Sequence, residues 1–173
     1  MHNAINAILF QCLWFSAILI GWEVAAVPAL LMAYHVYLTK PSYLLNLFIP
    51  AFIFLGVLWD SFLIATGLFQ ITGHPGSLGN VPLWLICCWL GFSFSLGLSM
   101  GWWTNYPKLF IAACMLFAPL SYFAGMRFGV LSFELFVLPI VAMGWGVLGA
   151  AVLWGLPKAV GLKFEADKGV WQS

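Results

Sequence analysis

Charged side chains are scarce in this chain of 173 residues, where Asp, Glu, Lys and Arg together make up 6% of the sequence. A soluble domain carries about 25% charged residues. The chain is instead 64% hydrophobic, and its mean hydropathy is +1.05. This composition excludes an ordinary water-soluble domain. The net charge of +1 and the lack of a basic stripe also give no support for nucleic-acid binding.

Patterns that hold metals or form disulfide frameworks are missing as well. The sequence contains no CxxC pair and no Cys/His cluster, and its four cysteines all lie in apolar stretches: Cys12, Cys87, Cys88 and Cys114. Buried thiols are the better interpretation. We therefore expect neither a metal site nor a cofactor.

A basic start to the chain is also missing. Residues 1–26 end in Val24-Ala25-Ala26, which looks like a signal-peptide cleavage site, but the first Lys or Arg is Lys40. A secretory signal has a positively charged segment before its apolar core. We therefore expect residues 1–26 to contain the first membrane span.

Long apolar runs, separated by Pro, Gly, Asn and Lys, predict an all-α bundle of about six transmembrane helices. The expected helices cover residues 4–21, 25–39, 43–69, 82–103, 108–126 and 130–156. The second is shorter than the roughly 20 residues that a span needs. Residues 1–156 are expected to form a single transmembrane domain, followed by a short polar tail at 157–173.

The basic residues predict the orientation of this bundle. With the N-terminus inside, one side of the membrane carries only Arg127, and the cytoplasmic side carries five lysines: Lys40, Lys108, Lys158, Lys163 and Lys168. Cytoplasmic loops are typically enriched in Lys and Arg. Both termini and the tail are therefore expected in the cytoplasm.

Asp60 is the most informative polar residue, because it lies inside the apolar run 44–69. A carboxylate near the centre of a membrane helix costs about 2.5–3.5 kcal/mol on insertion scales. One hypothesis is therefore that Asp60 has a function, as a proton donor, as a base or as a carboxylate that binds a ligand. The alternative is a structural carboxyl that hydrogen-bonds to a Trp or Ser of another helix.

Tryptophans fall into two groups by predicted depth. An aromatic belt at the membrane surface explains the residues near span ends, namely Trp22, Trp84, Trp102, Trp103 and Trp154. Three others, Trp14, Trp59 and Trp89, are predicted to lie deeper. Their indole N–H groups need acceptors, and Asp60 is a candidate.

Two further patterns allow a functional and a simpler interpretation. Arg127 and Glu134 flank the turn between the fifth and sixth helices, where they form either a site for an anion or lipid headgroup or a surface ion pair. Residues 97–101 match GxSxG within a predicted helix, and Ser99 shares its depth with His35. A serine hydrolase is therefore an alternative, although helix-packing glycines explain the motif better.

A series of ordered landmarks resembles a group of small bacterial inner-membrane proteins classified only as a domain of unknown function. The landmarks are Phe10 to Trp14, Leu58 to Phe62, Gly67, Pro82 to Trp84, Trp89, Pro119 to Tyr122, Gly125, Gly129 and Ser132. The resemblance implies a multi-pass protein of the bacterial inner (cytoplasmic) membrane. Members tend to occur beside genes for membrane fatty-acid modification, which points toward lipid. The resemblance implies no established activity.

Part of the third and fourth helices is also similar to the membrane-embedded carotenoid (lycopene) cyclase domains. The similarity rests on Trp59-Asp60, Gly67, Phe69, Pro82-Leu83 and Phe92. Those domains carry two glutamates after the Pro-Leu pair, where this chain has Trp84 and Leu85. The similarity therefore implies a related fold without the acid pair of the cyclase reaction.

These observations favour a membrane protein that binds or modifies a lipid or isoprenoid in a cavity around Asp60. Asp60 is the candidate catalytic acid, with ligand contacts from Trp14, Trp59, Trp89 and Tyr122. The sequence does not decide whether the protein is an enzyme. The alternatives are a non-enzymatic membrane partner or assembly subunit with a structural Asp60, and a small transporter.

Overall fold

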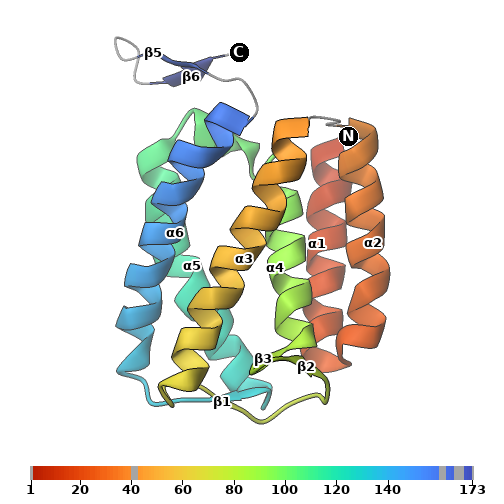
Figure 1. The fold of residues 1–173 in the computed structure, drawn as a ribbon, viewed down its shortest axis with the longest axis vertical. Helices are drawn as coiled ribbons and strands as arrows, with labels where there is room; N and C mark the ends of the chain where they lie inside the picture. Colours follow the sequence, from red (N-terminus) through yellow and green to blue (C-terminus); the bar gives the residue numbers. More distant parts are fainter. Residues whose placement is uncertain (1, 40–42, 160–162, 166–169, 173) are drawn as a thin grey trace.

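Six α-helices lie side by side as a bundle in the part of the chain that the structure describes (Figure 1). The structure is a computed structural model; it describes residues 2–39, 43–159, 163–165 and 170–172, with side chains over 2–39, 48–102 and 105–155. The helices are α1 (His2–Leu19), α2 (Trp22–Thr39), α3 (Tyr43–Ala65), α4 (Leu83–Ser95), α5 (Pro107–Arg127) and α6 (Val137–Ala159). The predicted all-α bundle is confirmed.

Short strands and one 3-10 helix connect or extend these helices. Strand β1 (Gln70–Ile71) pairs antiparallel with β4 (Leu131–Ser132), and β2 (Ser77–Leu78) pairs with β3 (Val81–Pro82). The 3-10 helix η1 (Gly101–Thr104) precedes α5. In the predicted polar tail, β5 (Lys163–Glu165) pairs with β6 (Val170–Gln172). Lys40 and Lys168, used to predict the orientation, lie outside the described residues.

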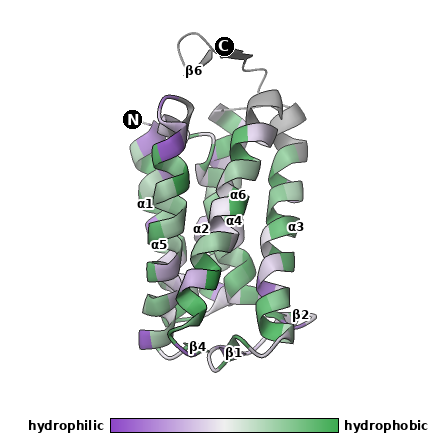
Figure 2. Cartoon of the chain, turned by 90° about the vertical axis from the view of Figure 1, so that its left-hand side faces the viewer, coloured by the Kyte–Doolittle hydropathy of each residue, from purple (hydrophilic) through white to green (hydrophobic). Residues whose placement is uncertain are grey.

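Four helices of the described chain are long and apolar enough to cross a membrane, over His2–Leu19, Phe48–Ala65, Pro107–Arg127 and Val137–Gly155. α4 is apolar but has 13 residues. Figure 2 shows hydrophobic residues along most of each helix, whereas many of the hydrophilic ones lie at helix ends and in loops. The chain is therefore a membrane protein, and the exposed apolar side chains along these four helices are suited to contact with lipid.

The two ends of the bundle differ in what they carry. Strands β1 to β4 gather at one end, and the start of α1 and the end of α6 lie at the opposite end (Figure 1). We call these the β1–β4 end and the termini end. Two of the expected helix boundaries were wrong at the β1–β4 end, because α3 ends at Ala65 and α6 begins only at Val137. Gly67 and Gly129, with φ of 74° and 78°, break the helices there, and the residues between α5 and α6 pair with β1 instead.

The fourth helix is shorter than the predicted 82–103. It ends at Ser95, whose hydroxyl donates to the Gly91 carbonyl (2.9 Å). Serine hydroxyls compete for backbone hydrogen bonds and glycine has a low helix propensity, so the chain leaves the helix within the Ser- and Gly-rich stretch, after Ser95. The GxSxG motif (residues 97–101) therefore lies after α4, so the expectation that it is part of the fourth helix was wrong, and a Cβ at Gly101 would meet no atom within 4 Å.

Asn6 of α1 holds this broken end of α4 in place. Its side chain is fully buried, donates to the Phe94 carbonyl (3.3 Å) and accepts from the Ser99 hydroxyl (2.6 Å). Elsewhere α1 packs on α2 and α4, α3 packs on α4 and α6, and α5 packs on α6. These contacts leave α1 and α5 on either side of the site described next.

Candidate functional site

Asp60 lies in the middle of the bundle and has no exposed surface. Its Oδ2 accepts a hydrogen bond from Trp89 Nε1 of α4 (2.6 Å), and its Oδ1 accepts one from the Tyr122 hydroxyl of α5 (2.7 Å). Both carboxyl oxygens are therefore bonded to protein donors. One side chain of α3 thereby connects three helices.

Gly56 explains how Trp89 reaches this carboxyl. Residues 56 and 60 lie one turn apart on the same face of α3. A Cβ at position 56 would overlap the Trp89 indole ring, so only glycine leaves room for the ring to lie against the helix. Trp145 of α6 then stacks on Trp89, with ring centroids 4.8 Å apart and an interplanar angle of 10°.

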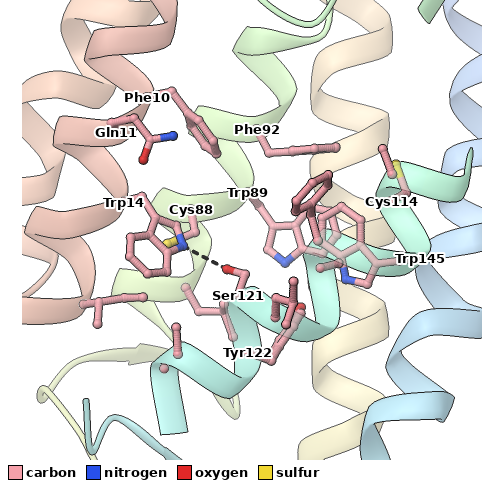
Figure 3. Close-up of a pocket in the computed structure, with 18 of the residues that line it drawn as sticks. Phe10, Gln11, Trp14, Cys88, Trp89, Phe92, Cys114, Ser121, Tyr122 and Trp145 are labelled. Carbon is pink, nitrogen blue, oxygen red and sulfur yellow. Dashed lines mark hydrogen bonds between the residues drawn. The ribbon is translucent and has the colours of Figure 1, made fainter. Parts of the chain in front are cut away.

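A cavity of about 570 Å³ lies beside this cluster, bounded mainly by α1, α4 and α5 (Figure 3). Ligand pockets have volumes of roughly 300–1,000 Å³ and largely apolar linings. The lining side chains are mostly aromatic or aliphatic, and they include Phe10, Trp14, Trp84, Trp89, Phe92, Phe110, Phe117, Ser121, Tyr122 and Trp145. None of the lining residues, which all belong to the described chain, is Asp, Glu, Lys, Arg or His.

The cavity opens between α1 and α5. The lining residues of these helices that are exposed are Gln11, Phe117 and Leu120. Trp14 Nε1 of α1 donates to the Ser121 hydroxyl of α5 across this gap (2.9 Å; Figure 3). The exposed lining residues Phe117 and Leu120 make one side of this opening apolar at the outer surface of the bundle.

The cavity extends along much of the bundle. Its lining on α5 runs from Phe110 to Gly125, which is about 22 Å at roughly 1.5 Å per residue. Trp84 lies near its β1–β4 end with 1% of its surface exposed, and the Trp84 Nε1–H has no hydrogen-bond partner among the described residues. Trp84 was expected in a surface aromatic belt, and that interpretation was wrong because the first turn of α4 faces the protein interior.

The structure places the residues predicted for the site in three different surroundings. Trp14, Trp89 and Tyr122 line the cavity, whereas Asp60 lies behind the last two and is not among the lining residues. Trp59 packs against Gly144 of α6 outside the cavity. Arg127 and Glu134 are exposed near the β1–β4 end and do not line the cavity either.

Ser99 and His35 have separate partners. The Ser99 hydroxyl donates to Asn6, and His35 Nε2 lies 3.4 Å from His2 Nδ1. A serine hydrolase needs its base within hydrogen-bond reach of the nucleophile. This geometry is therefore not that of a nucleophile and its base.

Several residues at the site were not predicted as site residues, among them the buried Asn6 and the lining residues Trp84 and Ser121. Asn6 could have been found by the reasoning applied to Asp60, since it is a polar residue within an apolar helix. Ser121 is also a polar residue within an apolar helix. Trp84 carries no such signal, because its neighbours in sequence do not reveal which face of the helix is buried. Only the packing of α4 and α5 around the cavity distinguishes it.

Comparison with known families identifies the chain at the level of its domain. A family model described as a protein of unknown function (DUF2878) matches residues 3–151. The chain belongs to this family. The match runs from α1 into α6, so every residue that lines the cavity lies within the DUF2878 domain.

No curated protein and no solved structure matches the chain. The expected membership of a domain of unknown function is confirmed, while the similarity to cyclase domains stays a prediction. The family description assigns no activity.

Proposed function

We propose that this protein binds a lipid chain or an isoprenoid in the cavity between α1, α4 and α5. The observation that carries the proposal is an elongated, uncharged and largely apolar cavity that opens between α1 and α5, two helices long and apolar enough to cross a membrane. An apolar ligand can leave the bilayer through such an opening without crossing water. Burial against protein then adds packing contacts that fluid lipid does not offer.

The dimensions of the cavity support a ligand of this class. The hydrocarbon core of a bilayer is about 30 Å thick, so a lipid chain in one leaflet spans about 15 Å. The cavity lining along α5 is longer than one such chain. Side chains from several other helices complete the cavity wall. A short polar metabolite would leave most of this apolar wall without contacts.

Asp60 acts in this proposal as a positioning residue. Its two hydrogen bonds fix the orientations of Trp89 and Tyr122, and both of these side chains form part of the cavity wall. The carboxyl group itself has no surface toward the cavity. In the orientation predicted from the lysines, the β1–β4 end faces the outside of a bacterial inner membrane, and the Asp60 cluster lies in the outer half of the bilayer.

The proposal is tested by mass spectrometry of lipids that stay bound to the purified protein. Ala113 lines the cavity, whereas the neighbouring Ala112 is exposed and does not. Ala113→Phe fills the cavity and is expected to remove most of the bound lipid, and Ala112→Phe is the matched control that retains it. Equal lipid in both variants, or none in the unchanged folded protein, would contradict the proposal.

A further inference from the structure

Gln11 is a polar side chain in the middle of a membrane-spanning helix. It lies about 12–14 Å from either end of α1, at roughly 1.5 Å per residue. The side chain is exposed and lines the cavity at its opening. Figure 3 shows the Gln11 amide extending from α1 in the same direction as the Trp14 indole. A ligand that enters the cavity therefore has direct access to this amide.

The Gln11 amide makes no hydrogen bond to another residue of the described chain. A carboxamide carries two N–H donors and a carbonyl acceptor in one plane. Inside a bilayer no water satisfies such groups, and leaving them unpaired costs free energy. The amide therefore favours a ligand that pairs with its donor and its acceptor together.

Ser121 offers a further donor on the opposite side of the opening. Its oxygen accepts from Trp14, which lies three residues after Gln11 on the same side of α1. The hydroxyls of Ser16 and Ser95 donate to the carbonyl four residues earlier, but the Ser121 O–H has no acceptor among the described residues. Because Ser121 is half-buried and lines the cavity, this O–H is available to a ligand beside Gln11.

The depth and the charge of this site limit the ligand. Lipid headgroups lie outside the hydrocarbon core, which is about 30 Å thick, whereas Gln11 lies near the middle of its helix. The residues that line the cavity, all within the described chain, include no Asp, Glu, Lys, Arg or His. An ionised group would therefore lose its hydration without gaining a charged partner. The polar group of the ligand is small and uncharged.

We infer that Gln11 binds the protonated carboxyl group of a free fatty acid through a pair of hydrogen bonds. The acid O–H donates to the Gln11 carbonyl, and the acid carbonyl accepts from the Gln11 N–H and from the Ser121 O–H. A primary fatty amide presents the same donor beside an acceptor, whereas an ester presents acceptors alone. This inference rests on the proposed function and specifies its ligand class.

The test measures retention of deuterated probes by the full-length protein in lipid nanodiscs. The probes are palmitic acid, palmitamide, methyl palmitate and hexadecane, each at mildly acidic and at alkaline pH. One additional hydrogen bond is expected to make retention of the acid, at acidic pH, and of the amide about two- to tenfold stronger than that of the ester. Retention of the acid is expected to fall at alkaline pH, because the acid ionises, while palmitamide retention does not change.

Gln11→Leu removes the amide, so it is expected to abolish the preference for the acid and the amide over the ester while hexadecane retention stays unchanged. Gln11→Met, with an unbranched side chain of similar length, carries the same expectation and replaces the Leu variant if that variant does not fold. Asn3→Leu is the matched control. It removes an exposed amide from α1 at a position that does not line the cavity, and it is expected to keep the full preference.

The outcomes separate the inference from the proposed function. A preference for the acid and the amide that survives the Gln11 substitutions overturns the inference. So does retention of palmitic acid that is equal at acidic and alkaline pH. If the unchanged protein retains all four probes equally, the inference fails while the proposed cavity function stands. If no probe is retained above the level of empty nanodiscs, both fail.

Discussion

The Asp60 cluster and the adjacent cavity are two buried regions that treat polar groups in opposite ways. In the cluster, both carboxyl oxygens accept hydrogen bonds from Trp89 and Tyr122. In the cavity wall, the Trp84 N–H donor has no partner among the described residues. A buried polar residue is therefore not by itself a binding site. A polar group that the protein leaves without a partner near a cavity is a stronger sign of a binding site than a buried polar residue alone.

The two regions share a wall. Trp89 and Tyr122 each bond to Asp60 and also line the cavity. Changes in the cluster are therefore expected to alter both stability and ligand retention, whereas changes in the opening are expected to alter retention with little effect on stability. The predictions below test this division.

The largest effect is expected for Asp60→Ala. This change leaves two buried donors without an acceptor, and each costs about 1–3 kcal/mol, so the loss of stability is about 2–6 kcal/mol. Asp60→Asn retains one acceptor oxygen and is expected to be intermediate. Thermal unfolding in mild detergent, followed by tryptophan fluorescence, measures the order. Equal melting of the unchanged protein and the Ala variant would contradict a structural role for the carboxyl.

A smaller loss is expected for Gly56→Ala. The added methyl group overlaps the Trp89 ring, and overpacking of this kind costs about 1–3 kcal/mol. Because the shifted ring also loses its bond to Asp60, the effects of Gly56→Ala and Asp60→Asn are expected to be less than additive. Gly101→Ala is the control, since a Cβ there meets no atom within 4 Å. A double variant whose losses simply add would show that Trp89 does not couple the two positions.

Trp14→Phe tests the opening of the cavity. It removes the hydrogen bond to Ser121 between α1 and α5, and such bonds between membrane helices average about 0.6 kcal/mol. We expect little change in melting but faster exchange of bound deuterated methyl palmitate, measured in nanodiscs. Trp154→Phe, at a position 77% exposed on α6, is the control. Unchanged exchange in Trp14→Phe would place the ligand's route elsewhere.

The smallest effect is expected for Arg127→Gln and Glu134→Gln. Both side chains are exposed and do not line the cavity, so melting and lipid retention are expected to stay within experimental error. The same mass spectrometry of retained lipid measures this. A loss of bound lipid in either variant would restore the predicted headgroup site at the turn between α5 and α6.

The sequence by itself determined the membrane bundle and the approximate positions of its six helices, because long apolar runs have few other stable states. It also identified Asp60 as a residue that needs partners, since an unpaired carboxyl in that run is costly. Trp14, Trp59, Trp89 and Tyr122 were expected to line a site around Asp60. The structure brings Trp89 and Tyr122 into direct contact with Asp60, whereas Trp59 lies outside the cavity.

Only the tertiary structure decided which of these groups bond to one another and where the cavity lies. The end of α4 at Ser95, the pairing of β1 with β4 and the burial of Trp84 all depend on contacts between residues far apart in the chain. In an almost uniformly apolar membrane protein, hydrophobic periodicity does not distinguish the lipid-facing side of a helix from its interior side. The partners of Asp60 and the position of the cavity therefore follow from helix packing.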